Sequence, residues 1–315
     1  MAHLRFDSPF DGKSPPEEPT RFNHGLAGHD LLSLDALARL AQRLDEDRVE
    51  YNSGSAEPDQ DPDKVAGVDL DPPEVVRQIE TCGAWMVLKN VETVPEYREL
   101  LEACFTDVLE TGEQSARKKD LWAAGFRDIQ GFIFVASPGS VTPFHVDYEE
   151  NFFVHLKGPK AMHVFDNRDR SFVSEPDLET YPGKHRNLAY RRDFEERAIV
   201  HTFEPGDGLY LPYTWPHWVR TGDAPAVSMA ITWKSPAVLN RNTLLFANAV
   251  LRRAGLAQPL PGRFPIYDRT KVLAFNTARA LIEPLRRSER SRRFLRNLFF
   301  GEKANYYYRN RGEEA

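Results

Sequence analysis

Three residues of types that bind transition metals stand in a suggestive arrangement near the middle of the chain. His145 and Asp147 lie two residues apart in the run Thr-Pro-Phe-His-Val-Asp, and His217 follows much later in Trp-Pro-His-Trp. Side chains two residues apart on a β-strand point to the same face, so His145 and Asp147 can bind one ion. Two histidines and one carboxylate leave about half of an octahedral shell open, which suits non-haem Fe(II) and its reaction with oxygen. The sequence therefore predicts a metal site formed by His145, Asp147 and His217.

The residues before His217 favour the same interpretation. A Pro-Gly-Asp turn at 205–207 leads into an apolar strand, and a second turn that contains proline then delivers the histidine. In a β-barrel this arrangement places His217 near the mouth, where it could face the first two ligands across the interior.

Short strands separated by turns are expected to position these ligands. From about residue 129 the pattern of apolar residues is typical of a β-sandwich or barrel. We expect strands at 129–136, 142–147, 151–157, 160–165, 199–203, 208–212, 216–221 and 226–233. The long charged segment 166–198 is interpreted as an insertion or a lid.

Helical periodicity dominates on both sides of this region. Residues 1–30 are expected to form an irregular arm and 52–72 a loop, with a strand at 85–89 between them and the barrel. Helices are expected at 34–44 with Ser33 as N-cap, and at 73–82, 95–109, 240–253, 271–287 and 288–299. The resulting division has an N-terminal arm with helices that pack on the barrel (1–120), the barrel itself (121–236) and a helical, basic C-terminal segment (237–315).

Composition narrows the class of protein. The chain has 315 residues, 41% of them hydrophobic, and a net charge of -6, which argues against a nucleic-acid-binding protein. Residues 251–315 nevertheless hold 15 Lys and Arg against 6 Asp and Glu. That basic segment could contact nucleic acid or an acidic partner, or form the solvated faces of helices.

Neither a membrane nor a secretory pathway is indicated. No apolar run approaches the length of a membrane span, and the N-terminus lacks the apolar core of a signal peptide. Cys82 and Cys104 do not have the spacing of a zinc site. We therefore expect two reduced core thiols in a cytoplasmic protein.

Residues 140–165 resemble a known family. The run Asn-Phe-Phe-x-x-x-Lys-Gly-x-Lys after the His-x-Asp is similar to the JmjC/cupin-8 group of 2-oxoglutarate-dependent oxygenases, and most of all to its asparaginyl hydroxylases. The segment at 261–265 resembles bacterial cupin-like proteins that are often described as transcription regulators. The resemblance, which covers roughly 130–235, implies a mainly β fold with flanking helices, built on a double-stranded β-helix (cupin or jelly-roll) barrel.

The resemblance also implies roles for individual residues. His145, Asp147 and His217 match the iron ligands of the group. Thr142 and Lys160 match the hydroxyl and the lysine that hold the distal carboxylate of 2-oxoglutarate, and Asn151 matches an amide that lines the cosubstrate pocket. A dicarboxylate buried in a barrel needs a cation and hydrogen-bond donors, because its desolvation is otherwise prohibitive.

One position departs from the pattern of the asparaginyl hydroxylases. They carry a pocket asparagine two residues before a tryptophan in the last barrel strand, where this chain has Ile231 before Trp233. Their substrate should therefore not be transferred to this chain. His155, His163 and His201 also fall in expected strands, and we interpret them as packed or exposed histidines.

The sequence thus predicts an Fe(II)- and 2-oxoglutarate-dependent oxygenase that hydroxylates a C–H bond. Its carboxylate ligand occupies the place that a halide would need, so hydroxylation is favoured over halogenation. The resemblance implies a protein or peptide substrate, with a small molecule still open, and a homodimer through the C-terminal helices. One alternative is a non-enzymatic, metal-binding or ligand-sensing cupin. A cupin enzyme without 2-oxoglutarate is disfavoured, because such sites usually use His-x-His and have no need of Lys160.

Overall fold

The computed structural model describes residues 3–60, 65–110, 121–184, 188–282, 291 and 294. The chain folds into two compact units. The first comprises Met1–Asn167 and Ala189–Pro236, and the second comprises Arg168–Leu188 and Ala237–Ala315. Of the helix expected at 288–299, all but residues 291 and 294 lies outside the described part of the chain.

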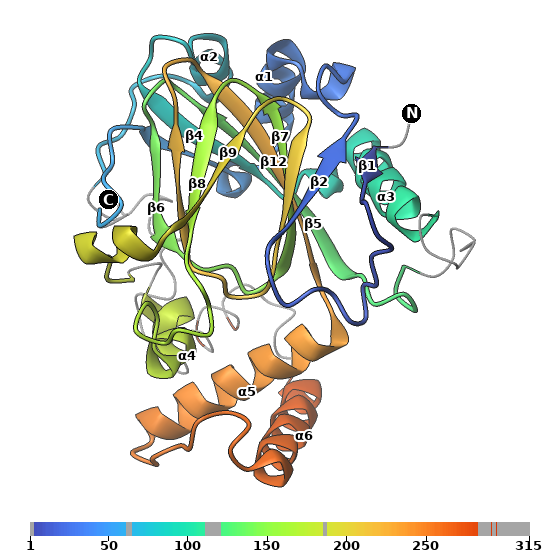
Figure 1. Ribbon diagram of the computed structural model, residues 1–315, viewed down its shortest axis with the longest axis vertical. Helices are drawn as coiled ribbons and strands as arrows, with labels where there is room; N and C mark the ends of the chain where they lie inside the picture. Colours follow the sequence, from blue (N-terminus) through green and yellow to red (C-terminus); the bar gives the residue numbers. More distant parts are fainter. Residues whose placement is uncertain are drawn as a thin grey trace. The chain divides into compact units, whose positions relative to one another are not determined.

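Two antiparallel sheets form the first unit (Figure 1). The larger sheet has the strand order β1-β2-β10-β7-β12-β5-β4-β3, and the smaller sheet has the order β6-β11-β8-β9. The larger sheet contains β1 (Leu4–Arg5), β2 (Thr20–His24), β3 (Val49–Ser53), β4 (Ala84–Lys89), β5 (Arg127–Ala136), β7 (Glu150–Lys157), β10 (Asp207–Leu211) and β12 (Ala226–Lys234). The smaller sheet contains β6 (Val141–His145), β8 (Lys160–Val164), β9 (Ile199–Phe203) and β11 (His217–Thr221).

The barrel expected from the sequence is present. From β5 to β12 the chain alternates between the two sheets, except that β8 and β9 follow one another in the smaller sheet, and this is the arrangement of a double-stranded β-helix. Every strand expected between residues 129 and 233 is formed, and its ends differ from the expected ones by no more than two residues. The prediction of a mainly β, cupin-like fold is therefore confirmed.

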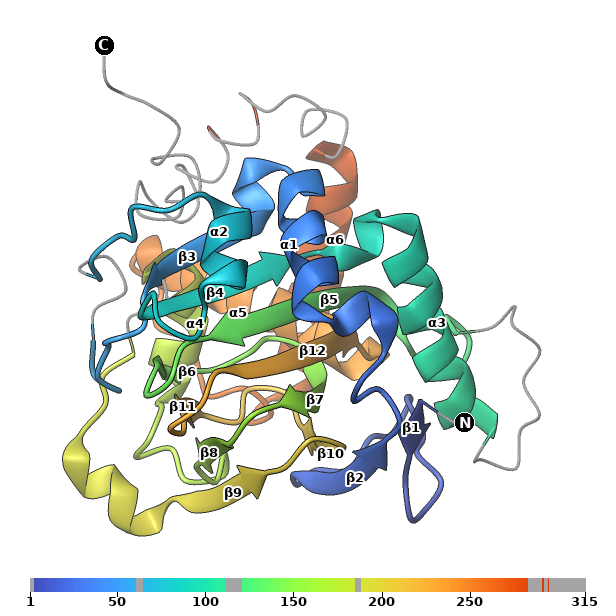
Figure 2. The same cartoon turned by 90° about the horizontal axis from the view of Figure 1, so that it is seen from above.

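The larger sheet has two faces with different roles. Phe152, Ile231 and Trp233 belong to a core shared with the helices α1 (Leu34–Arg43), α2 (Pro72–Arg77) and α3 (Pro95–Glu110). Figure 2 shows these helices on one side of the sheet and β8 and β9 on the other. The residues that alternate with these along the strands, such as Phe153, point to the other face. They pack with residues of the smaller sheet in a second core. The interior of the barrel therefore lies between the sheets, away from the helices.

The N-terminal residues are more regular than expected. The arm at 1–30 contains β1 and β2, and β2 pairs with β10 at the edge of the larger sheet. The expectation of an irregular arm was wrong here, because pairing with β10 is a long-range contact that the local sequence does not signal. β3 extends the other edge of the sheet and was also not expected. The helix at 34–44 is confirmed: the side chain of Ser33 accepts a hydrogen bond from the backbone N–H of Ala36.

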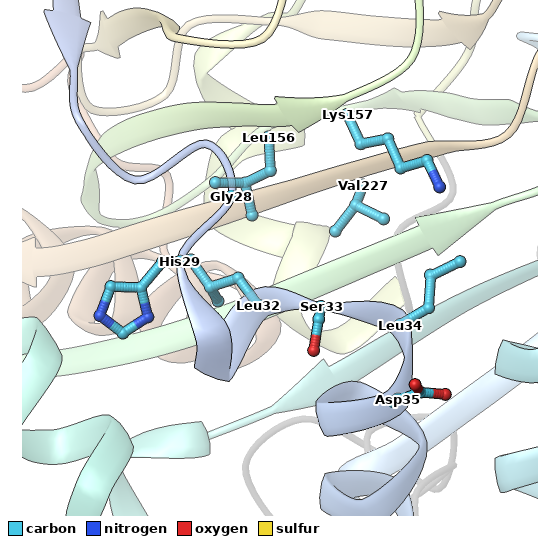
Figure 3. A pocket seen from close by; sticks show the side chains of 9 residues that line it. All are labelled: Gly28, His29, Leu32, Ser33, Leu34, Asp35, Leu156, Lys157 and Val227. Atoms are coloured by element: carbon cyan, nitrogen blue, oxygen red, sulfur yellow. The ribbon is translucent and has the colours of Figure 1, made fainter.

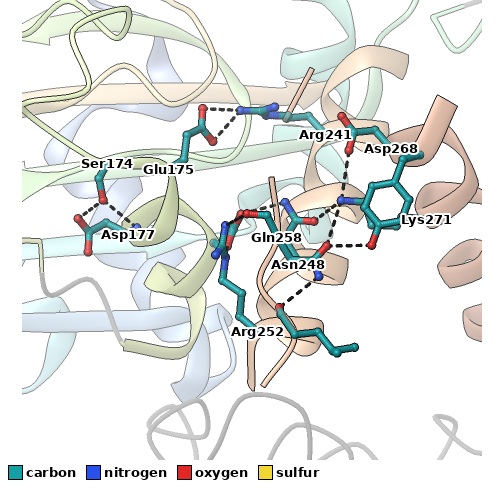
Figure 4. A network of polar contacts seen from close by, with 12 residues as sticks. Ser174, Glu175, Asp177, Arg241, Asn248, Arg252, Gln258, Asp268 and Lys271 are labelled. Carbon is teal, nitrogen blue, oxygen red and sulfur yellow. Dashed lines mark hydrogen bonds and ion pairs between the residues drawn. The ribbon is translucent and has the colours of Figure 1, made fainter. Parts of the chain in front are cut away.

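The second unit is helical and is held together by buried charges. It contains α4 (Glu175–Lys184), most of α5 (Pro236–Arg253) and α6 (Pro265–Ile282). Figure 4 shows Arg241 bonded to both carboxylate oxygens of Glu175. These two hydrogen bonds are each 2.8 Å long, and Nε of Arg252 donates to the buried Glu179 at 2.5 Å. Residues 168–188, which make up most of the insertion expected at 166–198, are therefore part of the C-terminal helical unit.

Cys82 and Cys104 are both free thiols, and Cys104 is buried. Burial raises the pKa of the Cys104 thiol, which leaves it protonated and unreactive. Among the described residues, no helix is long and apolar enough to cross a membrane.

Candidate metal centre

The structure brings the three expected metal ligands together. One ligand atom from each of His145, Asp147 and His217 lies within 4.8 Å of the other two. The Nε2 atoms of His145 and His217 are each 3.9 Å from an oxygen of Asp147, on different oxygens. Two imidazole nitrogens and a carboxylate at these separations can bind one divalent cation.

Backbone carbonyls fix the orientation of both histidines. Nδ1 of His145 lies 2.8 Å from the carbonyl oxygen of Pro143, and Nδ1 of His217 lies 2.9 Å from that of Trp215. In each case the carbonyl belongs to the residue two positions earlier. A proton on Nδ1 donates to that carbonyl and leaves the Nε2 lone pair directed at the shared site, which is the usual preparation of a metal-binding histidine.

An irregularity between β6 and β11 places two expected site residues on one face. His145 is paired with His217, whereas Thr142 is paired with Val219, so the register shifts between these pairs. Thr142 and His145 are three residues apart and would point to opposite faces of a regular strand. The shift, which falls between Thr142 and His145, allows both side chains to face the barrel.

A tight turn holds Asp147 beside the histidines. The backbone N–H of Thr214 donates to the carbonyl oxygen of Asp147 at 2.9 Å. Thr214 is buried and has a φ of 57°, which is strained for a β-branched residue. The Asn167 amide donates to the hydroxyl oxygen of Thr214 at 3.2 Å. This strained conformation is therefore supported by polar contacts, and it ties the turn before β11 to Asp147, the candidate carboxylate ligand.

Strand register arranges the inward-facing residues of the barrel in three rows. The metal row contains His145 and His217 on the smaller sheet, with Asn151 opposite Thr232 on the larger sheet. The apolar row contains Met162, Val219, Phe153 and Ala230. The deep row contains Lys160 on β8, and His155 opposite Ser228 on the larger sheet.

The metal row holds two buried polar atoms that lack a partner. Asn151 and Thr232 are each 4% exposed. Nδ2 of Asn151 lies 3.5 Å from Oδ2 of Asp147, which directs its Oδ1 away from that carboxylate. Within the described part of the chain, Oδ1 of Asn151 and Oγ1 of Thr232 make no hydrogen bond. Because buried polar atoms are nearly always paired, these two atoms favour a polar ligand at this position.

Lys160 supplies a buried cation in the deep row. It is 7% exposed, and its Nζ donates to Oγ of Ser228 at 2.7 Å. Burial lowers the pKa of Lys160 to about 7. A charged ammonium without a carboxylate to neutralise it is costly in an apolar barrel, so this position favours an anionic ligand.

Thr142 is prepared to donate a hydrogen bond. The indole Nε1 of Trp85 donates to Oγ1 of Thr142 at 2.9 Å. The threonine hydroxyl thus accepts from the protein and keeps its own proton for another acceptor. Thr142 belongs to the apolar row, because it is paired with Val219. Its hydroxyl therefore lies between the metal row and Lys160 along the direction of the strands.

One expectation about the last barrel strand was wrong. Ile231 does not line the interior but belongs to the core on the helix side of the sheet, together with Trp233. Thr232 and Ala230 face the barrel instead. Counting two residues back from Trp233 gave Ile231 as the pocket position, whereas the residue that faces the pocket is its neighbour Thr232. A shift of one residue along a strand moves the side chain to the opposite face of the sheet.

The three additional strand histidines lie in different surroundings. His163 stacks on Trp218 with ring centroids 3.8 Å apart and bonds to Glu195, so it packs on the outer face of the smaller sheet. His201 is half-buried in β9. His155 is packed and fully buried, as expected, but it faces the deep row of the barrel. His155, Ser228 and Thr232 are thus inward-facing polar residues to which the sequence assigned no role.

A separate surface hollow lies outside this site. Its volume is about 480 Å³, and it is lined by residues 28–29 and 32–35 with Leu156, Lys157 and Val227 (Figure 3). Ser33 caps the helix that begins there, and none of the metal-row residues contributes to the hollow. The hollow therefore has no part in the chemistry considered below.

Comparison with known proteins identifies the class of domain. Residues 85–237 match the family model of the cupin-like domain. The resemblance to the JmjC/cupin-8 group is thereby confirmed for this part of the chain, which contains every residue of the metal row.

Individual proteins similar to this chain share less than 30% sequence identity with it. Jumonji C domain-containing protein 5 of Drosophila melanogaster is 29% identical over 117 residues, which is 35% of this chain and 28% of that protein. The ribosomal oxygenase YcfD of Escherichia coli, solved with cobalt and 2-oxoglutarate, shares 19% identity. Its TM-score is 0.42, over 91% of this chain and 67% of that chain. The complex of the same protein with cobalt and succinic acid also has a TM-score of 0.42, at 18% identity over 90% of this chain and 67% of that one.

Proposed function

We propose that this protein is an Fe(II)- and 2-oxoglutarate-dependent oxygenase that hydroxylates a C–H bond. The observation that carries the proposal is the pairing of two features in one barrel. A two-histidine, one-carboxylate cluster lies at one level, and a buried lysine that pairs with no carboxylate of the described residues lies at a deeper level.

The spacing of the rows supports a five-carbon dicarboxylate. Val164 is paired with His217, and Lys160 lies four residues earlier on β8. At about 3.3 Å per residue the two rows are ~13 Å apart along the strand. An extended lysine side chain and a chelating 2-oxoglutarate together bridge such a distance. A metal-binding cupin without this cosubstrate has no use for the charge of Lys160.

The chain's residues divide the work of binding. His145, Asp147 and His217 would hold iron, and Lys160 with Thr142 would hold the distal carboxylate of 2-oxoglutarate. Asn151, whose Oδ1 lacks a partner, would line the pocket near the metal. When bound, iron and 2-oxoglutarate supply the oxidation of a C–H bond by dioxygen, with succinate and CO2 as coproducts.

The remaining inward-facing residues exclude water and orient the cosubstrate. Phe153, Met162 and Val219 are buried in the apolar row and offer no competing hydrogen bonds. In such surroundings the attraction between Lys160 and a carboxylate is much stronger than in water. Lys160 can carry the proton needed for that ion pair, because a bound carboxylate raises the pKa of an ammonium group.

The substrate is proposed to be a side chain of a protein or peptide, with a small molecule as the alternative. The resemblance to the asparaginyl hydroxylases supports this choice. Trp85 and Phe134, whose ring centroids are 6.0 Å apart, face the same side of the larger sheet as the metal row and are only half-buried. They lie on β4 and β5, beside the barrel, and offer apolar surface next to Thr142.

Succinate formation tests the proposed activity. The protein should convert 2-oxoglutarate to succinate slowly with Fe(II) alone, and faster when a library of peptides contains a substrate. The matched control is His217→Ala, which lacks one metal ligand and should form no succinate. Equal succinate from both proteins would refute the assignment, and so would binding of 2-oxoglutarate that does not depend on metal.

Assembly and location are proposed alongside the activity. The apolar side chains of Ile266, Leu273 and Leu281 are 81%, 69% and 76% exposed and follow one side of α6. A second copy of the chain could cover this stripe, so we propose a homodimer through the C-terminal helices, in the cytoplasm. Light scattering should give twice the mass of 36.0 kDa, and the triple change of these residues to glutamine should give the monomer mass.

A further inference from the structure

His155 is a buried histidine in the deep row that the proposed chemistry leaves without a role. It is 0% exposed, and it is paired across the sheet with Ser228, the residue that accepts a hydrogen bond from Lys160. Residues paired in this way on neighbouring antiparallel strands place their side chains on the same face, about 5 Å apart. His155 therefore shares the end of the cosubstrate pocket with Lys160 and Ser228.

The two ring nitrogens of His155 are in different situations. Nε2 lies 2.5 Å from the carbonyl oxygen of Gly158, so this nitrogen carries a proton and donates it. Nδ1 is buried and makes no hydrogen bond with any residue that the structure describes. In the neutral ring Nδ1 is an acceptor, whereas in the protonated ring it becomes a second donor. An unpaired buried nitrogen next to a buried ammonium group indicates that this end of the pocket is completed by a ligand.

We propose that His155 is a further cosubstrate-binding residue, which takes up a proton when 2-oxoglutarate binds and donates from Nδ1 to the distal carboxylate beside Lys160. The inference rests on the proposed function. A neutral His155 would present a lone pair to the carboxylate oxygens, and this arrangement is repulsive. The protonated ring instead lies between two acceptors, the Gly158 carbonyl and the carboxylate, and both of its N–H groups are satisfied.

The charges around His155 agree with a ring that is neutral before the ligand arrives. Burial lowers its pKa to about 4. Lys160 and His24 oppose its protonation, while the bond to the Gly158 carbonyl and the charge of Asp207 favour it. A carboxylate bound at the deep row would neutralise the charge of Lys160 and attract a proton to His155. Both effects raise the pKa of the ring, so binding and protonation support each other.

Calorimetry of the Mn(II)-loaded protein at pH 6 separates His155 from Lys160. At this pH Lys160 is already mostly protonated, whereas His155 is almost entirely neutral. Titration with 2-oxoglutarate in buffers of different ionisation enthalpy counts the protons taken up. We expect close to one proton in the unaltered protein and close to zero in His155→Gln, whose amide can donate a hydrogen bond without being charged.

The pH dependence of the unaltered protein provides a measurement that needs no variant. Its dissociation constant for 2-oxoglutarate should rise by close to tenfold between pH 5 and pH 6, because one proton accompanies binding. Binding without proton uptake at pH 6, or equal uptake by the unaltered protein and His155→Gln, would overturn the role of His155 and leave the proposed function intact. Absence of any metal-dependent binding of 2-oxoglutarate would overturn both.

Discussion

Replacing Lys160 with methionine should stabilise the protein and remove its cosubstrate affinity at the same time. Lys160 is buried, and burial lowers its pKa from 10.5 to about 7. The unfolded chain therefore binds more protons than the folded protein between these pH values, so stability rises with pH across this window. At pH 7 the buried lysine costs the folded state about 4 kcal/mol, because each tenfold loss of proton affinity corresponds to about 1.36 kcal/mol. Lys160→Met removes this cost, and up to about 4 kcal/mol should appear as added stability.

Urea unfolding of the metal-free protein at pH 7 measures this gain. The matched control is Lys89→Met, because Lys89 is equally buried at 7% exposure but forms an ion pair with Glu50. Removing that lysine breaks the ion pair of a partly buried carboxylate and should destabilise the protein. Calorimetry of the Mn(II)-loaded Lys160→Met variant should detect no binding of 2-oxoglutarate. A Lys160→Met variant less stable than the unaltered protein would refute the cost assigned to burying Lys160. A variant that binds 2-oxoglutarate as tightly as the unaltered protein would refute the role of Lys160 in binding.

Three further changes test other parts of the site. Asp147→Ala should weaken the binding of Mn(II), which electron paramagnetic resonance can follow. The loss of affinity should exceed the roughly 10- to 100-fold that loss of an outer-shell partner causes. Unchanged affinity would exclude Asp147 as a ligand. Trp85→Phe removes the indole that donates to the Thr142 hydroxyl. Because a neutral hydrogen bond contributes about 1 kcal/mol, calorimetry should show roughly fivefold weaker binding of 2-oxoglutarate. Tighter binding would contradict the proposed role of Thr142. Tyr210→Phe removes a 2.7 Å hydrogen bond to the buried Glu150, whose pKa is already raised by burial. Chemical unfolding should show that the free energy of unfolding falls by about 1–3 kcal/mol, and by more at pH 8 than at pH 5. An equal loss at both pH values would argue against an ionised Glu150.

Much of the barrel could be predicted because its signals are local. Most of its strands are short apolar runs with Gly, Pro or Asp near at least one end, and these residues indicate where a strand stops. The His-x-Asp spacing and the turn before His217 indicated the candidate ligands, and the structure brings them together. The cap at Ser33 could also be predicted, because N-capping depends on neighbours three residues apart.

Long-range pairing and strand register could not be predicted in the same way. The pairing of β2 with β10 joins residues that are far apart in the sequence, and nothing near Thr20–His24 signals its partner. The sequence named Ile231 as the pocket position, whereas the inward-facing residue is Thr232. Likewise, Ser228 and His155 become notable only when the register places them beside Lys160.

The helical unit illustrates a further limit. Glu179 and Arg252 form a buried ion pair that joins the expected insertion to α5. Each residue alone reads as an exposed charge on a helix, which is by far the commonest situation for such residues. Only the fold shows that residues 168–188 and the C-terminal helices form one unit.

Anaerobic titration of 2-oxoglutarate into the Fe(II)-loaded protein is the most direct test of the proposed oxygenase site. Chelation of a 2-oxo acid to Fe(II) gives a visible charge-transfer band. We expect a band that saturates with one equivalent of 2-oxoglutarate. It should be absent in His217→Ala and should require far higher concentrations of 2-oxoglutarate in Lys160→Met. Iron binding without such a band would contradict the oxygenase assignment and would favour a metal-binding or ligand-sensing cupin.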